Sequence, residues 1–266
     1  MKIVHFSSGL GNQIFFYLFS CYLQEKYPKQ MIYGYYPARN LKKHSGLEIA
    51  NVFDVCLPAH TVLSDLVAWF CRKINGIGIK GLKATDNNFL ESAIYFDGYY
   101  HDKCFIEGFE SKLRFREFEL DKINYSLKQQ IEACNSVSIH IRRGDYLLPE
   151  INRMFGGICT IEYYKQAIEV VREKITNSMF FVFSNDMDWV KDNLRLENAV
   201  YVTNNFGANS YLDMYLMSLC RANIIANSTF SYWAAMLNKN NPVVIYPQKW
   251  NHLHTPDMFP DNWIGL

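Results

Sequence analysis

Residues 140–145, His-Ile-Arg-Arg-Gly-Asp, end an otherwise apolar run that is predicted to form a buried strand. Arg142 and Arg143 are costly to desolvate at such an edge unless they meet an anion, and guanidinium groups match phosphate oxygens through paired hydrogen bonds. The alternative is an internal ion pair in which Asp145 neutralises one arginine. Because side chains alternate between faces along a strand, one arginine can bind a ligand while the other is paired with a carboxylate. We expect at least one arginine to bind an anionic ligand.

Residues 227–231, Asn-Ser-Thr-Phe-Ser, are predicted to turn from a buried strand into a helix. Free backbone N–H groups, the helix dipole and the hydroxyls of Ser228 and Thr229 converge there, which suits an anion. Ordinary N-capping by either hydroxyl is the alternative. Placed beside the arginine pair, this turn suggests that a diphosphate is held between the two.

Two further polar segments follow predicted strands. The loop 8–13, Ser-Gly-Leu-Gly-Asn-Gln, lacks both GxGxxG spacing and the Lys-Ser/Thr of a P-loop, which argues against a dinucleotide or ATP site. Asn12 either caps the following helix or reaches a ligand across a cleft. Asp186 and Asp188 could hold a metal together with nucleotide phosphates. The same spacing also occurs in the first turn of acid-capped helices, so the metal interpretation is not favoured.

Short apolar strands alternate with helical patterns, which predicts an α/β fold with parallel sheets and helices on both faces. Strands are predicted at 2–6, 31–36, 137–142, 179–184, 199–203, 223–227 and 242–246, and helices at 12–27, 64–83, 122–134, 161–174, 210–222 and 229–238. All four polar segments fall at strand C-termini, where ligands bind in open α/β sheets. We expect two units, 1–135 and 136–266.

Composition narrows the class of protein. The 266 residues carry a net charge of +1, so no overall field draws the chain to nucleic acid or holds it on an anionic membrane. Seven scattered cysteines without a CxxC pair indicate free thiols in a reducing compartment. No apolar stretch reaches the ~18 residues of a membrane span, and no signal peptide is expected. We expect a cytoplasmic protein. The predicted 64–83 helix carries Arg72, Lys73, Lys80 and Lys83. We expect these cations to lie on a solvated face of the helix, and contact with a membrane surface or with the acceptor is the alternative.

Ordered motifs run the length of the chain, at 9–13, 95–99, 140–146, 159–164, 183–186 with Trp189, 213–219, 227–237 and 247–250. Together they resemble those of the α-1,2-fucosyltransferases of glycosyltransferase family 11, which are mainly bacterial. The HxRRxD element at 140–145 is shared with α-1,6- and protein O-fucosyltransferases. The chain departs from the family pattern at Ser8, where Gly is usual, at Gly156, where His is common, and at Met236, where Trp is usual.

The resemblance implies a GT-B architecture of two facing Rossmann-like units, with the acceptor towards residues 1–135 and GDP-fucose in residues 136–266. It implies that Arg142 grips the donor diphosphate, that Arg143 is braced or assists, and that Asp186 contacts guanine. The implied donor site comprises Gly11, Asn12, His140, Arg142, Arg143, Asp186, Asn227, Ser228 and Thr229.

The implied reaction is inverting transfer of L-fucose from GDP-fucose to a galactose hydroxyl of a glycan, in α-1,2 linkage, for surface polysaccharide synthesis. Arginines and helix N–H groups would stabilise charge on the β-phosphate without a metal or other cofactor. A carboxylate is the natural base. Glu150 lies five residues after the aspartate of HxRRxD, which is the position of the proposed base in α-1,6 relatives. Asp145 is favoured instead as an ion-pair partner that holds the arginines in place. The alternatives are a GDP-sugar transferase of other linkage or sugar, a metal-dependent transferase and a non-catalytic GDP-sugar-binding protein.

Overall fold

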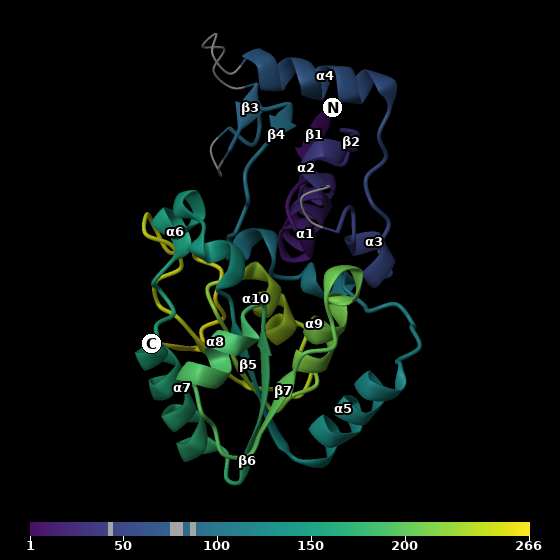
Figure 1. Ribbon diagram of the computed structural model, residues 1–266. Coiled ribbons are helices and arrows are strands. Elements are labelled where there is room, and N and C mark those ends of the chain that lie inside the picture. The colour runs from purple at the N-terminus through teal and green to yellow at the C-terminus, as the bar shows by residue number, and fades with distance from the viewer. Residues whose placement is uncertain (42–44, 75–81, 86–88) are drawn as a thin grey trace. The chain divides into compact units, whose positions relative to one another are not determined.

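The computed structural model describes residues 1–41, 45–74, 82–85 and 89–266 (Figure 1). The chain forms two compact units, Met1–Arg116 and Glu117–Leu266. This division lies upstream of the boundary that we expected after residue 135. The reason is helix α5 (Lys122–Ala133), which packs against strand β5 (Asn135–Ile141) and helix α9 (Tyr211–Met217) of the second unit.

The first unit is built on a parallel sheet of four strands in the order β2-β1-β4-β3. Its strands are β1 (Lys2–His5), β2 (Ile32–Tyr35), β3 (Lys83–Ala84) and β4 (Tyr95–Phe96), and its helices are α1 (Leu10–Lys26), α2 (Ala38–Leu41), α3 (Ile49–Val52) and α4 (Val62–Lys73). Short 3-10 helices cover Lys103–Phe105 and Glu110–Lys112. Helix α4 is shorter than the predicted 64–83 helix. Residues 75–81 of that helix, with Lys80 and the glycines, lie outside the described residues, and Lys83 begins β3.

The second unit contains a parallel sheet of six strands in the order β10-β9-β8-β5-β6-β7. The strands after β5 are β6 (Ser178–Ser184), β7 (Ala199–Val202), β8 (Ala222–Ile224), β9 (Val243–Tyr246) and β10 (Ile264–Gly265), and the helices besides α5 and α9 are α6 (Pro149–Phe155), α7 (Ile161–Lys174), α8 (Met187–Asn193) and α10 (Thr229–Met236). Counted along the chain within this unit, the strand order is 3-2-1-4-5-6, as in dinucleotide-binding folds. The order reverses between β5 and β8, which is where such folds bind ligands.

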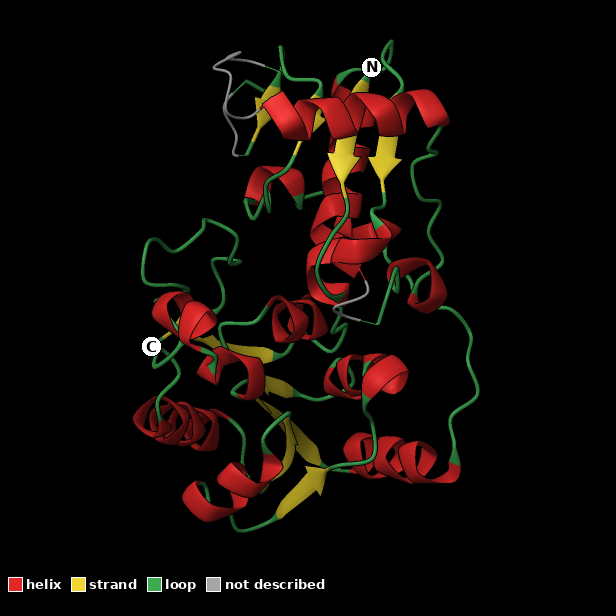
Figure 2. Ribbon diagram, turned by 45° about the horizontal axis from the view of Figure 1, so that its top comes forward, coloured by secondary structure: helices red, strands yellow, loops and turns green. Residues whose placement is uncertain are grey.

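Helices cover both faces of this six-stranded sheet, as the alternation of strands and helices predicted. Helices α7 and α8 lie on one side and α5 and α9 on the other (Figures 1 and 2). The α7 face packs Tyr164, Ile168 and Val171 onto the buried strands β5, β6 and β8. Helices cover both faces, so these strands are buried on both sides. Strand β6 is accordingly a continuous apolar run over Met179–Phe183, whereas β5 alternates apolar residues with the buried Ser136, Ser138 and His140.

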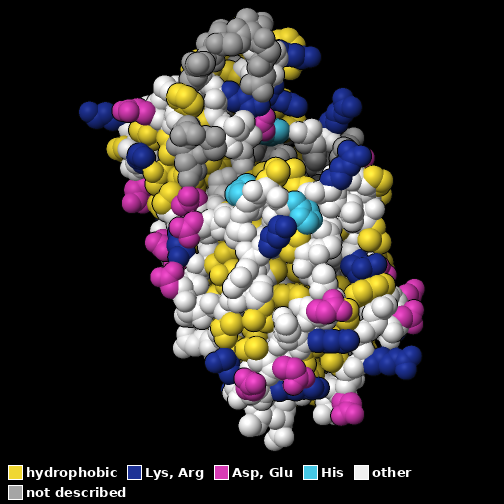
Figure 3. All heavy atoms as spheres, turned by 90° about the vertical axis from the view of Figure 1, so that its left-hand side faces the viewer, with side chains coloured by type: hydrophobic (Ala, Val, Ile, Leu, Met, Phe, Trp, Pro, Cys, Tyr) yellow, Lys and Arg dark blue, Asp and Glu magenta, His cyan; other side chains and the backbone are white. Residues whose placement is uncertain are grey.

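Charge is not segregated on the part of the surface drawn in Figure 3, where basic and acidic side chains are interspersed. This agrees with the net charge of +1. Among the described residues, no helix has both the length and the apolar character needed to cross a bilayer.

Candidate active site

The point where the strand order reverses brings two of the predicted polar segments together. Ile139 of β5 pairs with Ile224 of β8, so the residues three positions further on, Arg142 and Asn227, end at the same edge of the sheet. The ring of His140 lies 5.7 Å from the ring of Phe230 in the first turn of α10. The arginine pair and the α10 turn therefore border one site.

Arg142 is held by Asp145. Its Nε lies 2.8 Å from one carboxylate oxygen of Asp145, and its Nη2 donates to the other at 2.9 Å. The guanidinium carbon of Arg142 lies 5.8 Å from the ring centroid of Tyr146. The pair is about one-third exposed, since the two side chains retain 30% and 34% of their accessible surface. Among the described residues, Nη1 of Arg142 makes no hydrogen bond or ion pair.

Arg143 is also held by a carboxylate. Its Nε donates to Asp186 at 3.0 Å, and its guanidinium lies 4.0 Å from the ring centroid of Trp189. Its backbone N–H donates to the Asn185 side chain at 2.9 Å. We expected one arginine to be braced, and in the structure both are. Asp186 is too distant in sequence for its pairing with Arg143 to be predicted from spacing.

Gly144, directly after the two anchored arginines, lies close against Asn185. A Cβ atom at residue 144 would lie 2.5 Å from Nδ2 of Asn185. The Asn185 amide in turn binds the backbone of Arg143 and lies 3.5 Å from Asp145. The loop that follows β5 is therefore packed against the loop that follows β6, and this packing orients both guanidinium groups.

The N-terminus of α10 is not capped by a side chain. Ser228 occupies the N-cap position and is 7% exposed, but its hydroxyl makes no capping hydrogen bond. Helices α7 and α8 differ, because Thr160 and Asp186 accept from their first-turn N–H groups. Ordinary N-capping is therefore wrong for this turn. The N–H groups of the first turn and the positive end of the helix dipole are available to an anion.

Asn227 is committed to the protein itself. Its amide nitrogen donates to the carbonyl oxygens of Phe155 and Trp250, at 3.0 and 3.1 Å, and its amide oxygen faces the Cys159 thiol at 3.4 Å. Its backbone carbonyl accepts from Tyr146 at 2.9 Å. Asn227 is thus a positioning residue that joins the α10 turn to the loop after β5. Burial raises the pKa of the Cys159 thiol to about 12, so that group stays protonated.

His140 is neutral at ordinary pH. Burial, with a smaller contribution from the charge of Arg142, lowers the pKa of its imidazole to about 3. Its Nδ1 is buried and has no hydrogen-bond partner among the described residues. The imidazole therefore adds a polar but uncharged group next to Phe230 and within the electrostatic influence of Arg142.

The loop before α1 is organised by Gln13. The Gln13 amide nitrogen donates to the carbonyl oxygens of Ser8 and Gly46, at 3.0 and 2.8 Å, and its oxygen accepts from the N–H groups of Glu48 and Ile49. All four polar valences of a fully buried amide are thereby satisfied. The sequence showed Gln13 within a family motif, but nothing local indicated that its partners lie beyond residue 45.

Asn12 lies within the first turn of α1, which begins at Leu10 with Gly9 as its N-cap, so Asn12 does not cap the helix. Its Oδ1 is buried and has no hydrogen-bond partner in the described part of the chain. Gly11 is buried beside it. Ser8 has φ of +63°, a backbone conformation that favours glycine.

A His5–Asp97 pair at the carboxyl edge of the first sheet, in which His5 is buried and Asp97 is 28% exposed, was not predicted. His5 Nδ1 lies 2.6 Å from Asp97, whose second oxygen binds Lys83 at 2.8 Å, and Asn40 lies 3.2 Å from His5 Nε2. Burial alone would raise the pKa of Asp97, but the hydrogen bonds from His5 and Lys83 outweigh it and lower that pKa. The available signals were the strand-end positions of His5 and Asp97.

The two other acidic candidates, Glu150 and Asp188, each lie in the first turn of a helix. Glu150 is exposed in the first turn of α6, directly after Pro149. Asp188 lies in the first turn of α8, and Asp186 caps that helix by accepting from the N–H of Trp189 at 3.4 Å. In the described residues, no group of three His, Cys, Asp or Glu side chains is arranged to hold a metal ion.

Comparison with known proteins identifies the family. Residues 73–266 match the model of glycosyl transferase family 11. The chain belongs to glycosyl transferase family 11. It is 27% identical to an α-1,2-colitosyltransferase of Escherichia coli, over 99% of this chain and 98% of that protein. It is 28% identical to the O-antigen biosynthesis glycosyltransferase WbnK of Escherichia coli, over 98% of both. A human galactoside α-(1,2)-fucosyltransferase 1 is 31% identical over 41% of this chain and 30% of its own length.

The fold of this family 11 member is shared with solved structures. NodZ α-1,6-fucosyltransferase soaked with GDP-fucose matches with a TM-score of 0.50 and 11% identity, over 89% of this chain and 92% of that chain. NodZ from Bradyrhizobium matches with a TM-score of 0.51 and 10% identity. With two parallel α/β units, these likenesses confirm the predicted GT-B type of fold.

Proposed function

We propose that this family 11 enzyme moves L-fucose from GDP-fucose to a galactose hydroxyl of a glycan, in α-1,2 linkage with inversion, for surface polysaccharide synthesis. The observation that carries the proposal is the uncapped N-terminus of α10, which borders the same site as Arg142 and Arg143. These groups suit a diphosphate. The α-1,2 linkage and O-antigen context in the names of the relatives support the linkage and the role.

The second unit would bind the donor and the first unit the acceptor. Nη1 of Arg142 and the Nη atoms of Arg143 donate to the phosphates, together with the first-turn N–H groups of α10 and the hydroxyls of Ser228 and Thr229. Asp186 contacts guanine. Gly11 and Asn12 are the candidate donor contacts of the first loop, and the buried Oδ1 of Asn12, which has no hydrogen-bond partner among the described residues, supports this role. Asn227 acts through the turn that it positions.

The transfer breaks the bond between C1 of fucose and the β-phosphate oxygen, and GDP leaves with the electron pair. The acceptor oxygen forms its bond to C1 from the opposite face and gives its proton to a base. Negative charge grows on the β-phosphate as the fucosyl ring becomes oxocarbenium-like. Arginines held in place by Asp145 and Asp186 stabilise that charge without reorganising during the reaction.

Glu150 is our candidate for the base, because its carboxylate is exposed and the structure gives it no ion-pair partner among the described residues. Asp145 is the brace of Arg142, since both of its oxygens contact that guanidinium. Replacing Glu150 with Gln tests the assignment. A loss of kcat with unchanged GDP affinity supports it, and full activity excludes Glu150 as the base.

We propose that transfer requires no metal ion. Arg143 already neutralises the charge of Asp186, which argues against a role for this carboxylate in a DxD metal site, whereas each of its oxygens keeps a lone pair that can accept from guanine. The test is incubation of the purified protein with GDP-fucose and lactose in EDTA, with released GDP measured against a control without acceptor. Acceptor-dependent GDP release supports donor, acceptor class and metal independence together, and NMR of the product reports the linkage.

The colitosyltransferase among the relatives makes GDP-colitose a second candidate donor. Parallel assays with the two donors at equal concentration distinguish the sugars. If neither donor reacts, calorimetry with GDP separates the remaining cases. Binding of GDP that is lost in Arg142→Ala indicates a correct donor site with the wrong acceptor or a non-catalytic binding protein. No binding of GDP overturns the donor assignment.

A further inference from the structure

Helix α4 presents a row of large apolar side chains to solvent. These five residues, between 54% and 79% exposed, are Val62, Leu63, Leu66, Trp69 and Phe70. They recur at intervals of three and four residues, so they form one continuous stripe along the helix. Exposed apolar side chains scattered singly are ordinary, but a stripe of five on one helix marks an interaction surface.

The opposite side of α4 carries small residues. Ser64, Ala68 and Cys71 are buried, and the last two pack on Ile3 and Tyr95 of the sheet. The usual arrangement of a surface helix, with large apolar residues towards the core, is therefore reversed. The helix is firmly started, because Thr61 and Ser64 form a reciprocal capping box at 2.8 and 3.0 Å. Its outward stripe is thus a property of a well-formed helix.

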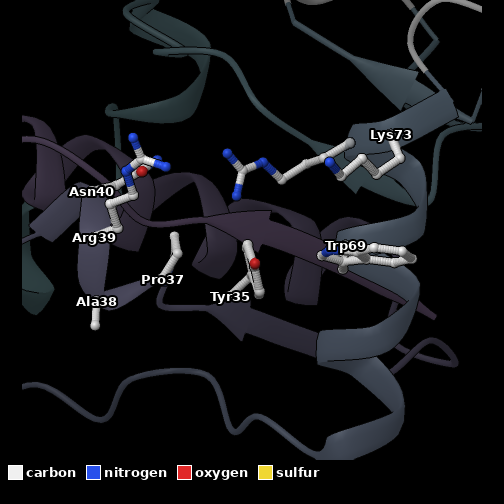
Figure 4. A pocket seen from close by; sticks show the side chains of 8 residues that line it. Tyr35, Pro37, Ala38, Arg39, Asn40, Trp69 and Lys73 are labelled. Atoms are coloured by element: carbon white, nitrogen blue, oxygen red, sulfur yellow. The ribbon is translucent and has the colours of Figure 1, made fainter.

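Positive charge borders the last turn of this helix. Arg72 and Lys73 end α4, and with Arg39 of α2 they line a pocket of about 530 Å³ that also includes Trp69 and Tyr35 (Figure 4). Lys73 Nζ lies 5.9 Å from the Trp69 ring. Within the described residues, no carboxylate lies within 4.0 Å of any of the three cations. The apolar stripe therefore runs into a pocket whose three cations have no carboxylate partner in the described part of the chain.

We propose that α4 is an interfacial membrane-binding helix whose apolar stripe enters the surface of an anionic bilayer while Arg39, Arg72 and Lys73 pair with lipid headgroups. Apolar residues with an aromatic beside cations are the composition of helices that lie in the plane of a membrane interface. A second copy of this chain would bring the same cations to the contact, whereas an anionic bilayer supplies their counter-charge. This surface goes beyond glycosyl transfer and does not depend on the donor.

The test is flotation of the purified chain, without donor or acceptor, with vesicles of phosphatidylcholine alone or mixed with phosphatidylglycerol. We expect binding to the mixed vesicles that weakens as salt rises. Replacing Leu63, Leu66 and Phe70 together with Ser, which leaves the pocket residues in place, should lower the partition coefficient at least about tenfold. Arg72→Gln with Lys73→Gln should remove the preference for phosphatidylglycerol. Phe206→Ser, at an exposed residue of the second unit, is the matched control.

Melting temperatures and GDP affinity establish that the variants are folded. The proposal is overturned if the wild-type chain does not float with mixed vesicles, or if Phe206→Ser lowers binding as much as the α4 variant. It is also overturned if α4 substitutions abolish a dimer seen by sedimentation while vesicle binding is absent. Arg142→Ala should bind vesicles like the wild type, so failure of the donor assignment and failure of this proposal give different results.

Discussion

Replacing Arg142 with Ala separates a phosphate clamp from a structural ion pair. The Arg142–Asp145 pair is about one-third exposed, so its loss should cost roughly 1 kcal/mol or less of stability. For a unit of this size, that is a fall in Tm of about 2–4 °C. A preorganised donor to the charge that develops in the transition state contributes far more. We expect kcat to fall about 10²–10³-fold, which corresponds to roughly 3–4 kcal/mol.

The assay measures acceptor-dependent GDP release and GDP affinity by calorimetry, alongside thermal unfolding. GDP affinity should fall about 10–100-fold, as expected for one charge-assisted hydrogen bond of roughly 1.5–3 kcal/mol. Arg142→Lys keeps the charge but loses the planar fork, so it should recover only part of the activity. Arg172→Ala is the matched control, because Arg172 makes an exposed ion pair with Glu169 on α7, away from the edge that bears the site.

The reasoning is refuted if Arg142→Ala retains kcat and GDP affinity within about threefold of the wild type. It is also refuted if the activity loss is matched by a large fall in Tm, because that result would make Arg142 a structural residue.

Three further outcomes follow from buried or strained groups. Gln13→Glu places a carboxylate against two carbonyl oxygens, and we expect a loss of about 3 kcal/mol or more by urea unfolding, whereas exposed Gln130→Glu should be nearly neutral. Ser8→Gly relieves a positive φ and should stabilise by about 0.5 kcal/mol; a clear loss would contradict this. Since the folded-state pKa of His140 is about 3 and its ordinary value is 6.5, the unfolded chain binds a proton first as pH falls. Unfolding free energy should therefore decrease from pH 6.5 towards 3, with a shallower slope in His140→Phe.

The central strands were the most predictable part of the fold. Strand β6 is covered on both faces and is an apolar run over Met179–Phe183, whereas β5 alternates apolar residues with Ser136, Ser138 and His140. The sheet places both strands within two residues of the predicted ends. Helix α9 was predicted at 210–222 but ends at Met217. The apolar pattern continues past that residue because a turn leads directly into β8 at Ala222. Periodicity alone does not separate those two uses of apolar residues.

The site was predictable in place but not in its internal contacts. The rule that ligands bind at strand C-termini singled out Arg142, Arg143 and the α10 turn from the sequence. The pairing of Arg143 with Asp186 depends on how two loops pack, which strand and helix patterns do not specify. Whether Ser228 caps α10 depends on the orientation of one hydroxyl, and the inward direction of Asn227 depends on partners more than twenty residues away.

The hydrogen bonds of Gln13 have a consequence for protein engineering. The Gln13 side-chain amide connects the loop at Ser8 to the segment that contains Gly46, Glu48 and Ile49. The conformations of these two segments therefore depend on each other. A loop variant that lacks Gln13 would leave the buried N–H groups of Glu48 and Ile49 without their acceptor. Libraries aimed at this loop should therefore keep Gln13 unchanged or vary both stretches together.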